Sequence, residues 1–232
     1  MCLQTPWVSE RFRPMEKSQL DLEMTRKMFV YVSKRMLDSK DFLTGLDRAI
    51  GDSDHGIGMA RGFEAVCTEL ENQSYDSVGK ILCNIGTTLM MSIGGAAGAV
   101  FGTMFRGSAS NLLAERRFTS RVLSRMLLDG LEAVKSRGGA KVGDKTMVDA
   151  LEPAAVKGKD LADVPLSQAL TLVAEEARKG MERTKEMLAT VGKAKTLGER
   201  ALGHPDPGSA STYLILKYMM EFTTASETRA NK

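Results

Sequence analysis

The sequence predicts an all-α protein, built as a closed barrel or bundle of about eight antiparallel amphipathic helices. Three observations lead to this fold class. Aromatic residues make up only 6% of the 232 residues and methionine occurs 15 times, and few aromatics with many Ala, Leu and Met favour helices over strands. Apolar residues recur about every four positions, which gives each helix one apolar face. The connections between the expected helices are short, and short connections favour antiparallel neighbours.

Successive segments carry this helical pattern along the chain. The first has an apolar face formed by Leu20, Met24, Met28, Val32 and Met36. The expected helices span 20–36, 41–50, 58–71, 76–91, 96–113, 119–136, 145–156, 167–188 and 209–222. The expected N-caps are Asp41, Asp76, Thr119 or Ser120, and Ser167, because a short polar side chain there accepts from a free backbone N–H. The helix over 96–113 is rich in small residues, so we expect it to pack closely against its neighbours.

Length and composition indicate one domain, which we place at 16–232, preceded by an extension at 1–15. The sequence contains no signal-peptide pattern and no stretch of about 18 apolar residues, so no membrane association is expected. Three cysteines without a CxxC pair, of which Cys67 and Cys83 are expected to be buried, favour a reducing cytoplasm. A net charge of only +3, with scattered Lys and Arg, does not favour a nucleic-acid partner.

Helical proteins usually avoid glycine, because each glycine weakens a helix interior by about 1 kcal/mol. In this chain it is nevertheless frequent. The 22 glycines concentrate at 51–62, 94–107, 138–143 and 192–208, near the ends of expected helices. Glycines at helix N-termini expose backbone N–H groups to an anion. Helix capping and close packing are the alternative explanation for any one of these segments.

The first glycine-rich segment also holds three carboxylates, Asp47, Asp52 and Asp54. Magnesium takes carboxylate together with phosphate oxygens, and three carboxylates this close repel one another unless a cation joins them. Turn formation, which Asp and Gly also favour, is an equally good explanation on spacing alone. Both histidines of the chain, His55 and His204, lie in such Gly- and Asp-containing loops, which favours a role for them in the site.

A third segment, Gly143-Asp144-Lys145-Thr146-Met147, superficially resembles the Gly-Lys-Thr of a P-loop. An Asp separates the glycine from the lysine, the upstream glycine pattern is wrong, and no strand is expected before it. We therefore reject a P-loop here.

Four blocks, taken together, resemble the nucleotide-binding L subunit of dihydroxyacetone kinase, the DhaL family. They are LTGLDRAIGDSDHGIGMARGF at 43–63, GGAAGAVFGTMF at 94–105, RGGAKVGDKTMVDAL at 137–151 and LGERALGHPDPGSAS at 197–211. Their order and spacing agree over about 20–222, which is nearly the whole chain. The combined signal is highly specific, although no single block would be.

The resemblance implies a barrel of eight antiparallel helices with a nucleotide, ADP or ATP, and two magnesium ions at one end. By similarity, Asp47, Asp52 and Asp54 ligate the Mg²⁺ ions. The residues expected to contact or line the nucleotide site are His55, Gly56, Ile57, Gly58, Ala96, Ala97, Gly138, Met147, Lys193, Asp206, Pro207 and Gly208.

The resemblance also implies a partner. The family transfers a phosphoryl group to dihydroxyacetone, which a separate K-type subunit or domain holds through a histidine, so this chain is expected to be a kinase subunit. In one branch of the family ATP is the donor. In the other, bound ADP is rephosphorylated by a phosphocarrier of the phosphotransferase system.

This sequence departs from the family pattern beside the phosphates. The family usually has Asn where Gly58 stands, Ser at Ala97, Pro at Ala99 and Arg at Lys193. Lysine keeps the charge but lacks the planar fork that binds phosphate through two hydrogen bonds. The lost polar contacts favour a nucleotide that exchanges, either ATP or ADP. A kinase subunit for another small ketose such as a tetrulose, and a non-catalytic nucleotide-binding protein, are the alternative functions.

Overall fold

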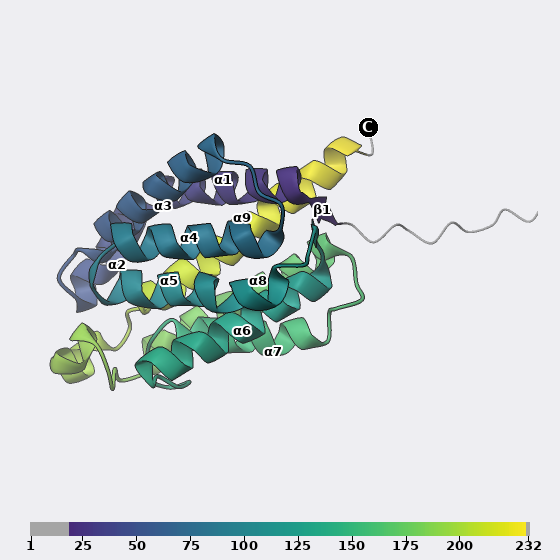
Figure 1. Cartoon of the computed structure of the whole chain (residues 1–232). Helices are drawn as coiled ribbons and strands as arrows, with labels where there is room; N and C mark the ends of the chain where they lie inside the picture. The colour runs from purple at the N-terminus through teal and green to yellow at the C-terminus, as the bar shows by residue number, and fades with distance from the viewer. Residues whose placement is uncertain (1–18, 231–232) are drawn as a thin grey trace, which may run out of the picture.

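The structure is a computed structural model that describes residues 19–230, and within them it is almost entirely helical (Figure 1). The α-helices are α1 (Leu22–Asp38), α2 (Lys40–Ile50), α3 (His55–Asn72), α4 (Val78–Ser92), α5 (Gly95–Ala109), α6 (Ser120–Gly138), α7 (Val148–Lys159), α8 (Leu166–Arg183) and α9 (Pro207–Ala230). Three 3-10 helices are η1 (Ser110–Leu112), η2 (Thr184–Glu186) and η3 (Lys193–Ala201). The all-α prediction is confirmed. The extension expected at 1–15 lies outside the described residues.

Eight of the helices form a closed antiparallel barrel. In chain order, α1 packs on α3, and each helix from α3 to α9 packs on the next one. The contact of α9 with α1 closes the ring. The short helix α2 lies across one end, between α1 and α3, at the left of Figure 1. The α2–α3, α4–α5, α6–α7 and α8–α9 connections all reach that same end, and they carry the four glycine-rich segments.

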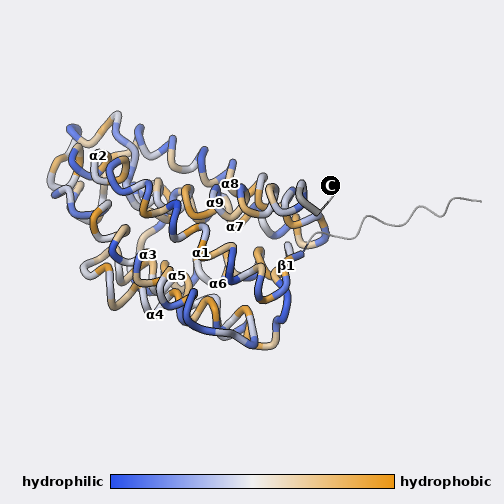
Figure 2. The backbone as a smooth tube through the Cα atoms, turned by 90° about the horizontal axis from the view of Figure 1, so that it is seen from above, coloured by the Kyte–Doolittle hydropathy of each residue, from blue (hydrophilic) through white to orange (hydrophobic). Residues whose placement is uncertain are grey.

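The helices are amphipathic, as the periodicity predicts. Hydrophilic and hydrophobic residues alternate along the helices in Figure 2. The apolar faces meet in one continuous core, which includes Phe29, Phe105 and Phe118. The ring of Phe29 meets those of Phe105 and Phe118 edge-on, with centroids 6.1 and 6.2 Å apart. No helix of the described part is long and apolar enough to cross a membrane.

The small-residue helix α5 packs closely against α4, as expected. A Cβ atom added at Gly86 would lie 2.7 Å from the carbonyl oxygen of Gly102, and one added at Gly102 would lie 2.8 Å from the carbonyl oxygen of Gly86. The backbones of α4 and α5 therefore touch at a point where neither helix has room for a side chain. This contact sets how the start of α5 lies at the site end of the barrel.

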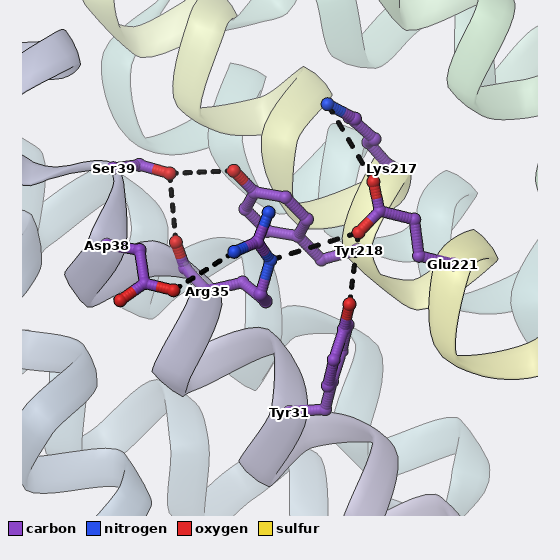
Figure 3. A network of polar contacts seen from close by, with 7 residues as sticks. All are labelled: Tyr31, Arg35, Asp38, Ser39, Lys217, Tyr218 and Glu221. Atoms are coloured by element: carbon purple, nitrogen blue, oxygen red, sulfur yellow. Dashed lines mark hydrogen bonds and ion pairs between the residues drawn. The ribbon is translucent and has the colours of Figure 1, made fainter. Parts of the chain in front are cut away.

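A polar network holds α9 to α1 at the seam that closes the barrel (Figure 3). Tyr218 of α9 makes a 2.7 Å hydrogen bond with Ser39, the residue between α1 and α2. Because the Ser39 hydroxyl donates to the carbonyl of Arg35, the Tyr218 hydroxyl acts as the donor to Ser39. The Arg35 guanidinium carbon lies 5.0 Å from the centre of the Tyr218 ring, and Tyr31 donates to Glu221 at 3.1 Å. The network fixes the place where α2 begins.

Several expected boundaries are wrong by a few residues. Ser77, not Asp76, caps α4, and its hydroxyl accepts from Lys80 N–H. Ser39 and Pro165, not Asp41 and Ser167, precede α2 and α8, whereas Thr119 caps α6 as expected. Helix α3 begins at His55, before the expected residue 58. Helix α8 ends at Arg183, before residue 188, and α9 continues to Ala230, beyond residue 222.

Three further expectations need correction. The helix expected from residue 145 begins only at Val148, because the Asp149 carboxylate accepts from Gly143 N–H and Thr146 N–H and so holds 143–146 in a turn. A two-residue antiparallel pair, β1 (Leu20–Asp21) with β2 (Arg117–Phe118), was not expected from the sequence. It is too short to produce an alternating pattern. Cys67 and Cys83 are half-buried thiols and not fully buried ones.

Candidate metal and nucleotide site

The three aspartates meet at the end of the barrel that α2 covers. Asp47 lies in the last turn of α2 and is 8% exposed. Asp52 and Asp54 lie in the connection to α3 and are exposed. One carboxylate oxygen from each of the three lies within 4.8 Å of the others. This arrangement of hard oxygen ligands fits a divalent cation such as Mg²⁺.

The backbone of 51–54 is shaped by the residues that bring these carboxylates together. Gly51 follows α2 directly, and a Cβ atom there would overlap the Asp47 carboxylate. Ser53 has a φ of 67°, a left-handed conformation that costs energy for a residue other than glycine. The Asp47 carboxylate in turn accepts from His55 N–H at 3.1 Å, at the first residue of α3. Asp47 therefore joins the end of α2 to the start of α3.

The His55 ring points inward and joins three helices. Its Nε2 atom lies 2.8 Å from the Ser211 hydroxyl oxygen of α9, and its centroid lies 6.3 Å from that of the Phe101 ring of α5. Burial lowers the pKa of His55, against the pull of the Asp47 and Asp54 charges, so the ring is neutral at pH 7. The side chain positions α3 against α9, and the backbone of α3 is what faces the carboxylates.

Lys193 is brought to the aspartates from a distant part of the chain. It begins η3, which lies beside α2 in Figure 1. Its ammonium group contacts the Asp52 carboxylate and lies 3.1 Å from an Asp54 oxygen. The pairing with Asp52 lowers the pKa of that carboxyl and raises the pKa of Lys193. The sequence predicted Lys193 in the nucleotide site, and the structure places it on the predicted metal ligands.

The glycines at the starts of α3 and α5 allow close approach. Gly56 has no room for a side chain, since a Cβ atom there would overlap the Lys40 carbonyl and the Thr44 hydroxyl of α2. At Gly58 a Cβ atom would lie 3.2 Å from Ile93 Cγ2, so the Asn usual in the family requires Ile93 to move.

Gly94 and Gly95 take positive φ values of 76° and 56° and turn the chain into α5. Ala96 and Ala97 lie in the first turn of that helix, while Ile57 is 50% exposed at the start of α3.

Met147, at the start of α7, meets the fourth glycine-rich segment beside this cluster of helix ends. A Cβ atom at Gly208 would lie 3.4 Å from Met147 Cβ and 3.1 Å from an Asp206 carboxylate oxygen. Asp206 precedes α9 and accepts from Ser209 N–H at 2.6 Å. Pro207 is the first residue of α9 and is buried. Met147, Asp206, Pro207 and Gly208 are therefore neighbours, as the resemblance implies.

Two titratable groups of these segments, Asp206 and Lys145, have shifted pKa values. Burial raises the pKa of Asp206 from 3.8 to about 7, and the Asp149 charge adds to this effect. Burial lowers the pKa of Lys145, which the Asp206 and Asp149 charges oppose. Lys145 is 2% exposed, and its ammonium donates to the carbonyls of Thr184 and His204 at 2.5 and 2.6 Å. It has a φ of 60°. It serves as an internal anchor, in agreement with the rejection of a P-loop.

Two residues singled out from the sequence lie apart from these contacts. Gly138 is the exposed last residue of α6, and a Cβ atom there would meet nothing within 4 Å. His204 is exposed, and its carbonyl oxygen, not its ring, takes part in the contact with Lys145. Conversely, sequence reasoning missed Asp149, Ser211 and the anchoring role of Lys145. The polar residues of the segment 143–149 were the available signal, because buried polar side chains must find partners.

Comparisons with known proteins show a family match over most of the chain. A family model described as the DAK2 domain matches residues 49–221. The ADP-binding subunit DhaL of the PEP-dependent dihydroxyacetone kinase of Escherichia coli (strain K12) is 40% identical over 181 residues, which cover 77% of this chain and 86% of that relative. The corresponding subunit of the PTS-dependent dihydroxyacetone kinase of Lactococcus lactis subsp. lactis (strain IL1403) is 32% identical over 202 residues, covering 87% of this chain and 98% of the relative.

A solved structure has the same fold. The crystal structure of the dihydroxyacetone kinase from C. freundii in complex with AMP-PNP and Mg²⁺ superposes with a TM-score of 0.68 at 25% sequence identity. The match covers 95% of this chain and 37% of that kinase, so this chain spans little more than a third of its length. The family model, the two relatives and the fold agree over most of the sequence, and this chain belongs to the DAK2 domain family, together with the DhaL subunits.

Proposed function

We propose that this chain is the Mg²⁺- and nucleotide-binding subunit of a dihydroxyacetone kinase, a phosphotransferase. The observation that carries the proposal is the grouping of Asp47, Asp52 and Asp54 at one end of a DAK2-type barrel. The relatives named as ADP-binding subunits and the C. freundii kinase named with AMP-PNP and Mg²⁺ support it. We assign the nucleotide-binding domain to residues 16–232 and propose a cytoplasmic location.

The three aspartates would hold Mg²⁺, with two ions as the proposed number. The metal supplies neutralisation of the charge that develops on the transferred phosphoryl group. Asp47 is positioned for this by Gly51 and by the N–H of His55. Asp52 and Asp54 are exposed, and an incoming nucleotide can therefore share a metal with them.

The helix starts around the aspartates would hold the nucleotide. The N-terminal turns of α3 and α5 would offer free backbone N–H groups to phosphate oxygens at Gly56, Ile57, Ala96 and Ala97. His55 and Gly58, whose N–H groups donate to the Asp47 carboxylate and the Asp54 carbonyl, are proposed to line the site. The packed group of Met147, Asp206, Pro207 and Gly208 is proposed as a further wall of the site. Gly138 and Lys193 complete the proposed set.

The phosphoryl acceptor would be presented by a separate protein. The described residues offer a phosphate site in these loops, and neither histidine of the chain is free of the nucleotide segments to hold a ketone. We therefore propose a K-type, dihydroxyacetone-binding subunit as partner. The relatives named as PEP- and PTS-dependent kinase subunits support a phosphocarrier of the phosphotransferase system as a second partner.

The metal assignment is tested with Asp52→Asn. This change removes one carboxylate charge from an exposed position, so the helical circular dichroism spectrum should be unchanged. Calorimetric titration with ADP should show that the Mg²⁺-dependent part of the affinity is lost. Asp160→Asn, at an exposed position after α7, is the matched control and should bind as the wild type does. Equal Mg²⁺-dependent affinity in both variants would contradict the assignment.

The donor is tested by mass spectrometry of the protein after extensive desalting in Mg²⁺. Gly58, Ala97 and Lys193 replace polar or bidentate family residues, so we expect the nucleotide to exchange and to be lost. One equivalent of ADP retained through purification would identify ADP as a resident cofactor. Assays with the partner subunit, comparing dihydroxyacetone with tetruloses and ATP with a phosphocarrier, then identify the acceptor and the donor.

A further inference from the structure

Lys193 contacts two of the three carboxylates that the proposed function assigns to the metal. Its ammonium is placed on Asp52 and Asp54 from a segment about 140 residues further along the chain, as the separations of 141 and 139 residues record. An ammonium donates hydrogen bonds to the same carboxylate lone pairs that a divalent cation needs for coordination. The two cations therefore cannot fully occupy Asp52 and Asp54 at the same time.

The segment that carries Lys193 is fixed at both ends. The ammonium of the buried Lys145 joins the carbonyl of Thr184, at the end of α8, to the carbonyl of His204, before α9. Gly203 N–H donates to the Lys185 carbonyl at 2.8 Å beside this contact. Residues 186–202 thus form a loop whose two ends meet, with Gly192 at a φ of 73° turning the chain into Lys193.

The ion pair that Lys193 makes from this loop is weak, because all three side chains are exposed. The side chain of Lys193 is 60% exposed, and those of Asp52 and Asp54 are 51% and 69% exposed. Ion pairs between exposed side chains contribute little and are screened by salt. A divalent cation carries twice the charge of the ammonium. The anchored ends stay in place when the ion pair breaks, because Lys145 is buried and its partners are carbonyl groups.

We propose that Lys193 and Mg²⁺ are alternative partners of Asp52 and Asp54, so that the loop over 186–202 closes on the metal site through Lys193 and is released when the metal binds. This rests on the proposed metal site. Lys193 then lowers the affinity for the metal and couples the motion of the loop to metal occupancy, while Lys145 keeps the ends of the loop fixed.

The test measures binding of Mn²⁺ alone, a paramagnetic substitute for Mg²⁺, by electron paramagnetic resonance of the full chain without nucleotide. Lys193→Met should bind Mn²⁺ about two- to fivefold more tightly than the wild type, the factor expected for loss of an exposed ion pair. Lys195→Met is the matched control, because it removes the same charge from the same loop at an exposed position. Lys193→Arg should behave as the wild type.

A second measurement follows the loop itself. Hydrogen exchange of the backbone amides in 186–202 should become faster when Mn²⁺ or Mg²⁺ is added to the wild type. In Lys193→Met the exchange should already be fast and should not respond to the metal. These results would support the proposal.

The outcomes separate this proposal from the proposed function. Equal Mn²⁺ affinity in Lys193→Met, Lys195→Met and the wild type, with Asp52→Asn weakened, would overturn the competition and leave the metal site intact. An equal gain in Lys193→Met and Lys195→Met would also overturn it, because the effect would then be one of net charge. Mn²⁺ affinity unaffected by Asp52→Asn would overturn the metal assignment and the competition together.

Discussion

At the scale of single residues, the absence of a side chain at Gly51 is what lets Asp47 face the other two aspartates. A Cβ atom at this position overlaps the Asp47 carboxylate, which is itself buried between α2 and His55 N–H. The carboxylate must therefore move if position 51 carries any side chain. The position of the Asp47 carboxylate therefore depends on the missing Cβ atom at residue 51.

Gly51→Ala should consequently weaken Mg²⁺-dependent nucleotide binding by about tenfold or more, since displacing a buried charged ligand costs about 1–3 kcal/mol. Gly45→Ala, inside the preceding helix α2, is the control, because a Cβ atom there meets nothing within 4 Å. It should leave binding unchanged and stabilise the protein by about 0.5–1 kcal/mol. Calorimetric titration with ADP and urea unfolding measure both effects. Unchanged ADP affinity in Gly51→Ala would show that Asp47 does not hold the metal.

Asp206 makes the stability of the protein depend on pH. Its pKa is about 7 in the folded protein and 3.8 in the unfolded chain. Between these values the folded state keeps a proton that the unfolded state has lost, so this group's contribution to stability falls as the pH rises from about 4 to 7. The size of this change is on the order of 4 kcal/mol. The lowered pKa of His55 acts in the opposite direction, because it opposes protonation of the folded state at low pH.

Asp206→Asn should remove the Asp206 contribution while the amide oxygen still accepts from Ser209 N–H. The variant's free energy of unfolding, relative to the wild type, should therefore rise between pH 4 and pH 7. Urea unfolding at several pH values measures this difference, and subtraction of the wild-type curve removes the effect of His55. A difference that stays constant with pH would mean that Asp206 is ionised like an exposed aspartate.

At the scale of helices, the contact between α4 and α5 depends on two glycines. Gly86 and Gly102 face each other with carbonyl oxygens 2.7 and 2.8 Å from where the Cβ atoms would stand. Backbone atoms cannot give way as the end of a flexible side chain can. The packing of these two helices is therefore specified by the lack of side chains, and it places Gly94–Ala97 at the site.

Gly86→Ala and Gly102→Ala should each destabilise the protein by about 1–3 kcal/mol, because they force two packed helices apart. Gly158→Ala in α7 is the control, since its Cβ atom would have only ordinary contacts, the nearest at 3.5 Å. It should be neutral or stabilising. Urea unfolding followed by circular dichroism compares the three, and equal stabilities would refute the close contact between α4 and α5.

At the scale of the whole molecule, the barrel brings the α2–α3, α4–α5, α6–α7 and α8–α9 connections to one end, and the β1–β2 pair lies at the other end. The candidate site is therefore built from the four connections that lie at this end of the barrel. The barrel closes at the seam between α1 and α9. The Ser39–Tyr218 hydrogen bond at this seam lies at the start of α2, the helix that carries Asp47.

The purified chain should not phosphorylate dihydroxyacetone by itself. In the proposed function this chain supplies metal and phosphate contacts, and the acceptor is held by a K-type subunit. A coupled assay with ATP or a phosphocarrier should show turnover only after that subunit is added. Sustained turnover by the chain alone would refute the division of labour between subunits.

The amino-acid sequence alone predicts the all-α fold class, the positions of the helices and the grouping of Asp47, Asp52 and Asp54, although one helix ends eight residues beyond the expected position. Helical periodicity and local residue chemistry are written in short stretches of chain, so these features need no knowledge of distant residues. The closeness of Asp47, Asp52 and Asp54 follows from the same local spacing. Family resemblance added the nucleotide segments, of which Met147, Asp206, Pro207 and Gly208 meet in the structure.

Contacts between residues far apart in the chain become visible only in the folded structure. It placed the Lys193 ammonium on Asp52 and Asp54, and it buried Lys145 between the carbonyls of Thr184 and His204. It also directs the His55 ring to Ser211, a partner that the sequence analysis did not predict. These contacts join residues separated by between 39 and 156 positions. Their energies depend on burial and on the closing of the barrel, neither of which any local pattern of residues records.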